Sequence, residues 1–110
     1  MANQKFIIKR LEKIITEIRD SGISLRKVIL FGSYAKNTQH RWSDVDVALV
    51  ADEFKGIDFY DVGLISRILI KYPTLLIQPR TYNPSQFTPK KDPMVEEILK
   101  TGIEIFAWPL

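Results

Sequence analysis

The fold of this chain is decided by the stretch KVILFGSYAK at residues 27–36 together with SDVDVALV at residues 43–50. An apolar run rich in strand formers ends at a Gly-Ser turn, and ten residues separate Ser33 from Asp44 at the start of the next apolar run. Because side chains alternate across a strand, Asp44 and Asp46 point to one face and the valines between and after them to the other. The stretch therefore predicts two strands, with a pair of carboxylates at the start of the second.

The carboxylate pair and the Gly-Ser turn together indicate a site for a metal ion that carries a phosphate chain. Two carboxylates this close repel each other unless a cation lies between them, and Mg²⁺ is commonly held by one or two carboxylates plus substrate phosphates. Gly32 would let the backbone approach a phosphate, Ser33 would bind phosphate oxygens at a helix start, and Lys36 would reach a phosphate one turn later. The structural alternative is an edge strand with solvated aspartates, a glycine that ends a strand and a solvated lysine.

Strands and helices alternate along the rest of the sequence. The expected helices span residues 4–20, with Asn3 as the N-cap and Gly22 after the end, 33–37, 58–71, ended by Pro73, and a last helix from Asp92-Pro93 to Gly102. The expected strands span residues 27–31, 45–50, a third beginning at 75–77 and a final one at 103–106. In the helix at 58–71 the residues expected to face inward are Phe59, Val62, Ile65 and Leu69. The pattern predicts an α/β domain over residues 1–110, with a single mixed β-sheet of about four strands covered by helices.

Composition excludes several classes of function. The chain of 110 residues has no cysteine, so thiolate metal sites and a cysteine nucleophile are excluded, in keeping with a cytoplasmic protein. No apolar run approaches the length that spans a bilayer, and no signal-peptide core is present. The net charge of +3 comes from scattered lysines and arginines, which disfavours nucleic-acid binding.

These residues resemble the minimal nucleotidyltransferase (MNT) domains of the DNA polymerase β-like nucleotidyltransferase superfamily. The resemblance rests on Gly32-Ser33, ten residues and then Asp44-x-Asp46, and it extends to the helices around the motif and to residues 97–105. It implies a polymerase β-like palm fold in which Asp44 and Asp46 hold one or two Mg²⁺ ions and the triphosphate of ATP or another NTP. Gly32 and Ser33 would cradle the β- and γ-phosphates while an acceptor hydroxyl attacks the α-phosphate and releases pyrophosphate. It also implies an antitoxin paired with a HEPN-domain toxin, a helical ribonuclease; some members adenylylate a tyrosine of that partner.

The sequence departs from the family at a third carboxylate, which usually lies on a later strand. Gln78 stands at that position in Leu75-Leu76-Ile77-Gln78, and a glutamine carries no charge and is a poor base. Two interpretations therefore remain: an active nucleotidyltransferase, or a degenerate antitoxin that binds nucleotide and neutralises its toxin by contact. A stand-alone enzyme acting on a small molecule is disfavoured, because no second domain is evident to hold the acceptor. The substitutes considered for the missing carboxylate, most of them expected to be solvated, are Asp52, Glu53, Asp58 and Asp61.

Four other residues have less specific interpretations. Arg80 is a candidate for nucleotide phosphate or a partner's carboxylate, although an exposed strand-end arginine is the simpler expectation. His40 has no second histidine to share a metal, and Tyr34 is expected to pack rather than stack on a base. Trp108 belongs to an apolar tail that either closes the core or forms an exposed patch for a partner or a second copy, with the patch favoured.

Overall fold

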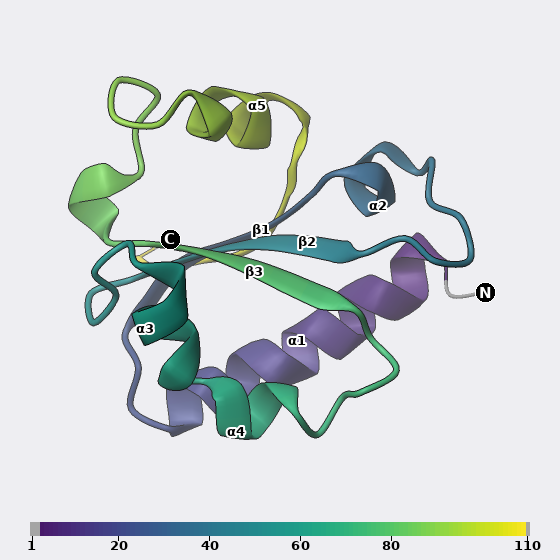
Figure 1. The fold of residues 1–110 in the computed structure, drawn as a ribbon, viewed down its shortest axis with the longest axis horizontal. Helices are drawn as coiled ribbons and strands as arrows, with labels where there is room; N and C mark the ends of the chain where they lie inside the picture. The colour runs from purple at the N-terminus through teal and green to yellow at the C-terminus, as the bar shows by residue number, and fades with distance from the viewer. Residues whose placement is uncertain (1–2, 110) are drawn as a thin grey trace.

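A four-stranded sheet with helices on both of its faces makes up the computed structural model, which describes residues 3–109 (Figure 1). The helices are α1 (Gln4–Asp20), α2 (Ser33–Lys36), α3 (Asp58–Gly63), α4 (Ser66–Leu69) and α5 (Pro93–Thr101), with a 3₁₀ turn η1 (Pro84–Gln86). The strands are β1 (Leu25–Phe31), β2 (Val45–Ala51), β3 (Ile77–Tyr82) and β4 (Ile103–Ala107). The predicted α/β class and single mixed sheet are confirmed. Among the described residues, no helix is both long and apolar enough to cross a membrane.

The order of the strands in the sheet is β3-β2-β1-β4. β1 runs antiparallel to both β2 and β4, whereas β2 and β3 are parallel and are connected by the crossover through α3 and α4. β3 is an edge strand, which is where a proline such as Pro79 can be accommodated without breaking the ladder. The third strand runs from Ile77 to Tyr82, so Leu75 and Leu76 of its predicted start lie before it, and its last two residues, Thr81 and Tyr82, are buried.

Each face of the sheet has its own core, and the division decides which side chains lie on the functional face. The larger core packs α1, through Ile7, Leu11, Ile14, Ile15 and Ile18, against the β1 and β2 side chains Val28, Leu30, Val45, Val47 and Leu49. On the other face, α5 contributes Val95 and Ile98, which join Ile29, Ala48, Val50 and Tyr82. Since side chains alternate along β2, Asp46 lies on the same face as Ala48 and Val50, the face that α5 partly covers.

The predicted helix ends are confirmed at both ends of the chain. The side chain of Asn3 accepts a hydrogen bond of 2.8 Å from the backbone N–H of Phe6, which caps α1. At α5 the Asp92 side chain accepts from the N–H of Met94 at 2.9 Å, and Pro93 occupies the first helical position.

The helix predicted over residues 58–71 is wrong in extent, and one of its four residues expected to face inward is misplaced. Two short helices, α3 and α4, replace it, and Phe59, expected inside, is 96% exposed. The buried row runs through Asp61, Ile65 and Ile68, so a fully buried carboxylate occupies one position of the inward face. Ile65 is buried as predicted, and Val62 and Leu69 are half-buried. The apolar pattern did not indicate that an aspartate, rather than Phe59, occupies the first turn of this face.

Candidate active site

Asp44, Asp46 and Gly32 meet at one end of the sheet, where β1 ends and β2 begins. Phe31 is the strand partner of Asp46, so the turn that follows β1 is held next to the carboxylate. A Cβ built on Gly32 would overlap Oδ2 of Asp46 and would lie 3.1 Å from its Cγ. The motif that the sequence separates by ten residues is therefore one contiguous site in the fold.

Gly32 is required by its backbone conformation as well as by space. Its φ of 74° lies in the region that side chains other than glycine rarely adopt. The turn passes into α2, where the N–H of Lys36 donates to the carbonyl of Gly32 at 3.1 Å. Asn37 closes this short helix with φ of 57°, the left-handed conformation that asparagine tolerates.

The electrostatics of the carboxylate pair favour a cation. Burial raises the pKa of the Asp46 carboxyl above its ordinary value, and the charge of Asp44 raises it further. Asp44 is exposed and Asp46 is half-buried, so the pair opens to solvent. Oxygen ligands that repel each other and face an open site fit the requirements of Mg²⁺ bound together with phosphate oxygens. Asp44 and Asp46 are the residues that would hold it.

Lys36 lies beside the site but is already paired. Its ammonium is 3.4 Å from the Glu97 carboxylate of α5, and both side chains are about half exposed. An ion pair this exposed contributes little to stability and exchanges readily for another anion. The predicted phosphate role of Lys36 therefore remains a prediction, with Glu97 as the competing partner.

Gln78 lies beside Asp46 in the parallel pairing of β2 with β3. Residues paired in this way point to the same face of the sheet, so Gln78 is placed on the opposite side of Asp46 from Gly32. Across residues 3–109 no group of three or more His, Cys, Asp or Glu residues is arranged to hold a metal. The two aspartates are thus flanked by an amide on β3.

The acidic residues considered as substitutes for a third carboxylate have other partners. Asp52 forms a bidentate ion pair with Arg26, and Glu53 accepts from the N–H of Ser24 at 2.7 Å. Asp58 accepts from the N–H and the hydroxyl of Thr81, both at 3.0 Å. Asp52, Glu53 and Asp58 are exposed, as expected of most of these residues, whereas Asp61 is 0% exposed. Its oxygens accept from the backbone N–H groups of Lys55, Gly56 and Ile57, which form the loop before α3, and from the Thr81 hydroxyl.

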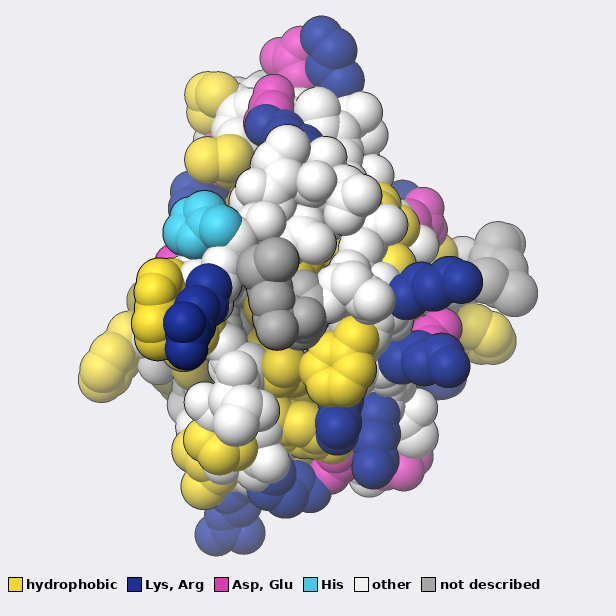
Figure 2. Space-filling view, turned by 90° about the vertical axis from the view of Figure 1, so that its right-hand side faces the viewer, with side chains coloured by type: hydrophobic (Ala, Val, Ile, Leu, Met, Phe, Trp, Pro, Cys, Tyr) yellow, Lys and Arg dark blue, Asp and Glu magenta, His cyan; other side chains and the backbone are white. Residues whose placement is uncertain are grey.

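The loop between α2 and Asp44 is ordered by its own hydrogen bonds. The backbone N–H of His40 donates to Oγ of Ser43 at 2.8 Å, and the N–H of Ser43 donates back to the His40 carbonyl at 3.0 Å. Trp42 in this loop is 71% exposed, and the Arg41 guanidinium lies over its ring. The face that carries the cyan histidine shows lysines and arginines spread among other side chains (Figure 2). Tyr34 is buried, as predicted, and Trp108 is 53% exposed.

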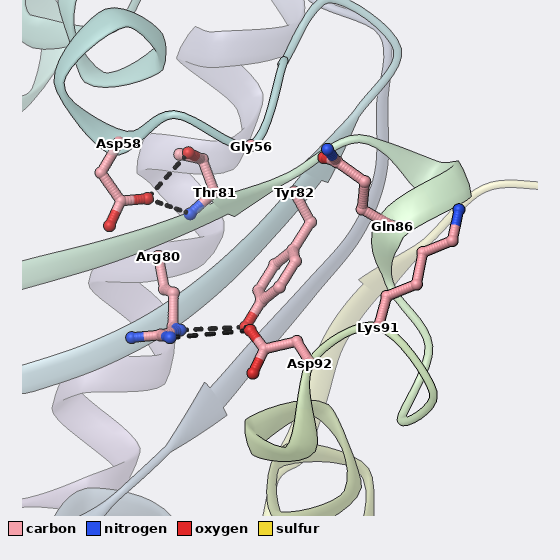
Figure 3. Close-up of a pocket in the computed structure, with 8 residues that line it drawn as sticks. All are labelled: Gly56, Asp58, Arg80, Thr81, Tyr82, Gln86, Lys91 and Asp92. Atoms are coloured by element: carbon pink, nitrogen blue, oxygen red, sulfur yellow. Dashed lines mark hydrogen bonds and ion pairs between the residues drawn. The ribbon is translucent and has the colours of Figure 1, made fainter.

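A polar hollow further along β3 is not indicated by the Gly-Ser and aspartate motif. It has a volume of about 290 Å³ (Figure 3), and its lining, named here the β3 hollow, consists of Gly56, Asp58, Arg80, Thr81, Tyr82, Gln86, Lys91 and Asp92. Arg80 Nε donates to the Tyr82 hydroxyl at 2.9 Å, and that hydroxyl donates to Asp92 at 2.9 Å. The hydrogen bond to Tyr82 raises the pKa of Arg80, which keeps the guanidinium charged. The alternation of Gln78, Arg80 and Tyr82 at every second position was the available signal.

Comparisons with known proteins identify the family of this chain. A family model described as a nucleotidyltransferase domain matches residues 8–105. The "Putative protein adenylyltransferase MJ0141" of Methanocaldococcus jannaschii is 33% identical over 101 residues, covering 90% of this chain and 95% of that protein. The protein adenylyltransferase MntA of Shewanella oneidensis is 51% identical over 39 residues, which are 36% of this chain and 28% of that protein.

Solved structures share the fold at lower identity. A "putative nucleotidyltransferase" from Sulfolobus solfataricus superposes with a TM-score of 0.68 at 20% identity, over 96% of this chain and 84% of that one. A chain of a toxin–antitoxin structure with AMP-PNP gives a TM-score of 0.64 at 22% identity, over 89% of this chain and 74% of that one. With a family model that matches nearly the whole sequence and the Gly-Ser turn placed against the aspartate pair, the chain belongs to the nucleotidyltransferase domain family.

Proposed function

We propose that this protein is a cytoplasmic, Mg²⁺-dependent protein adenylyltransferase that transfers AMP from ATP to a hydroxyl of a partner protein. The observation that supports this most is the close approach of Gly32 to the Asp46 carboxylate, which brings the Gly-Ser turn directly against the aspartate pair. The relative in Methanocaldococcus jannaschii, which this chain matches over 90% of its length, carries the same activity in its name.

The residues of the site would bind the metal and the phosphates and would align the reacting groups. Asp44 and Asp46 would hold Mg²⁺, which when bound screens the phosphate charge from the carboxylates. Gly32 and Ser33 would hold the β- and γ-phosphates at the end of β1, and Lys36 would exchange Glu97 for a phosphate oxygen. The acceptor hydroxyl would attack the α-phosphorus and lose its proton to solvent, while the bond to the bridging oxygen breaks and pyrophosphate leaves with that electron pair. Binding and in-line alignment are therefore the contributions expected of this small domain.

The partner is proposed from the relatives. The chain matches MntA of Shewanella oneidensis over 39 residues, and it shares its fold with a chain of a toxin–antitoxin structure. We therefore propose that the acceptor is a toxin, of the HEPN class that the resemblance of the sequence implies, and that modification or binding neutralises it.

A second function, a nucleotide-binding antitoxin without transferase activity, is favoured by one observation. Gln78 pairs with Asp46 across β2 and β3, at the place where a carboxylate would complete the site. An amide there does not add charge for a second metal and does not accept the proton of the attacking hydroxyl. Nucleotide binding by Asp44 and Asp46 would survive this replacement.

Transfer of label from ATP labelled at the α-phosphate separates the two functions. The purified chain is incubated with Mg²⁺ and a lysate of its host, beside Asp44→Asn/Asp46→Asn as the control and Gln78→Glu as a parallel sample. Label on a discrete protein that disappears with the double variant supports the transferase. Label that appears with Gln78→Glu and not with the native chain supports the binding antitoxin, and no label in any sample contradicts the transferase.

A further inference from the structure

We propose that the β3 hollow is the docking site for the polypeptide that carries the acceptor hydroxyl, and that Arg80 selects a segment with a carboxylate side chain next to that hydroxyl. The inference rests on the proposed transferase function, and it adds the side from which the acceptor enters and the chemistry that recognises it.

The direction of entry follows from the geometry of displacement at phosphorus. The attacking and leaving oxygens lie roughly in line on opposite sides of the α-phosphorus. Gly32, at the end of β1, lies on one side of Asp46, and Gln78 of β3 is paired on the other side. If pyrophosphate is held at the Gly32 turn, the hydroxyl has to approach across β3.

The β3 hollow lies on that approach. Gln78, Arg80 and Tyr82 are every second residue of one strand, so they share the face that carries Asp46. At about 3.3 Å per residue, Arg80 lies about 7 Å from Gln78 along the strand and Tyr82 about 7 Å further. In Figure 3 the side chains of Arg80 and Tyr82 extend from β3 toward Asp92 at the start of α5, and all three residues line the hollow.

Both carboxylates of the hollow are already engaged with donors of the protein. Three of the four oxygens of Asp58 and Asp92 already accept: one from Thr81, one from Tyr82 and one from the N–H of Met94. Arg80 has five N–H groups, of which Nε bonds Tyr82, and its Nη2 lies 3.6 Å from Asp92. The remaining guanidinium N–H groups have no hydrogen bond within residues 3–109.

Arg80 is also held in place for recognition. The Tyr82 hydroxyl and the Asp92 carboxylate fix one edge of its guanidinium, so little side-chain entropy remains to be lost when a ligand binds the other edge. A carboxylate fits this free edge because it accepts two parallel N–H bonds. A volume of about 290 Å³ accommodates one or two side chains rather than a folded domain, which indicates an extended segment.

Peptide binding tests the inference independently of turnover. Three fluorescein-labelled peptides of glycine and serine carry one central tyrosine, flanked on each side by two glutamates, two glutamines or two lysines. Fluorescence anisotropy measures their affinity for the native chain loaded with Mg²⁺ and a non-hydrolysable ATP analogue. The glutamate peptide should bind about tenfold more tightly than the lysine peptide, the size expected of one charge-assisted pair.

Variants assign the preference to the hollow. Arg80→Gln should remove the preference, and Arg80→Lys should restore only part of it because lysine lacks the planar fork. Arg67→Gln is the matched control, since Arg67 is exposed on α4, on the opposite face of the sheet, and should keep the preference. Equal binding of the three peptides to the native chain, or a preference that survives in Arg80→Gln, overturns the inference.

Calorimetry with the Mg²⁺–nucleotide complex separates the inference from the function on which it rests. Arg80→Gln should bind nucleotide as the native chain does. Weaker nucleotide binding with unchanged peptide binding would make the hollow a nucleotide subsite and overturn the inference. A native chain that binds no nucleotide contradicts the proposed function, whereas nucleotide binding without an acidic preference contradicts the inference alone.

Discussion

The α-carbon of Gly32 lies so close to the Asp46 carboxylate that any side chain at residue 32 would displace it. The close approach brings the end of β1 against the start of β2 and positions the carboxylate pair. Gly22 offers a matched comparison, because its φ of 97° is also positive but nothing lies within 4 Å of an added Cβ.

Gly32→Ala should therefore lower both the free energy of unfolding and nucleotide binding. Gly22→Ala should lower the free energy of unfolding alone. Left-handed strain in alanine costs about 1 kcal/mol, which is the full effect expected at residue 22. Displacement of Asp46 should bring the loss at residue 32 to about 3 kcal/mol and abolish nucleotide binding. Urea unfolding and calorimetry with the Mg²⁺–nucleotide complex measure the two effects, and normal nucleotide affinity in Gly32→Ala would contradict this account of the site.

The metal-free protein should lose stability as the pH rises through the titration of Asp46. Burial and Asp44 raise the pKa of this carboxyl in the folded state. Between its ordinary pKa and the raised one, the folded state binds more protons than the unfolded state, so the free energy of unfolding falls with increasing pH over that interval. Asp46→Asn should remove this dependence and raise Tm near neutral pH in EDTA.

Adding Mg²⁺ with ATP should make the Tm of the native chain higher than that of Asp46→Asn. A ligand that binds only the folded state raises its stability. The native Tm should rise and that of Asp46→Asn should stay constant. Glu12→Gln, at an exposed position of α1, controls for the loss of one negative charge and should behave as the native chain does. A Tm of Asp46→Asn below the native value in EDTA would show that the carboxylate pair is not under repulsion.

The paired positions of Asp46 and Gln78 give a third prediction. Gln78→Asp adds a carboxylate beside two others, so Tm in EDTA should fall, and the rise produced by Mg²⁺ should exceed that of the native chain. Thr16→Glu, exposed on α1 on the other face of the sheet, adds the same charge and should show no response to Mg²⁺ beyond the native one. Equal responses of all three proteins to Mg²⁺ would place Gln78 outside the metal site.

The regular parts of this fold could be predicted from the sequence because local signals agree with the tertiary structure. The apolar spacing of α1, the cap at Asn3 and the Asp92-Pro93 start of α5 each specify an element without reference to the rest of the chain. The Gly-Ser and aspartate motif likewise places Gly32 and Asp46 together. Each of these features depends on residues close in sequence or on a motif with a fixed spacing.

The features that could not be predicted from the sequence depend on polar contacts between residues far apart in the chain. The orientation of α3 depends on Asp61, whose partner Thr81 lies 20 residues away, and no periodicity of apolar residues indicates a buried carboxylate. The β3 hollow likewise depends on Arg80 and Tyr82 meeting Asp92 across a loop. Polar residues were expected at the surface, and the misplacement of Phe59 follows from that expectation.

The buried Asp61 carboxylate predicts one of the larger losses of stability in the chain. It accepts from the backbone N–H groups of Lys55, Gly56 and Ile57 at 2.9 to 3.0 Å and from the Thr81 hydroxyl at 2.7 Å. Asp61→Ala would leave these donors without an acceptor in a buried position, which should cost about 3 to 5 kcal/mol. Asp20→Ala, at an exposed position, should change stability by less than about 0.5 kcal/mol.

Because the same network ties the loop before α3 to β3, hydrogen exchange at Gly56 and Thr81 should accelerate in Asp61→Ala while exchange in α1 follows global unfolding. A loss below about 1 kcal/mol, or unchanged exchange at Thr81, would mean that water replaces the carboxylate and that Asp61 does not hold the two segments together.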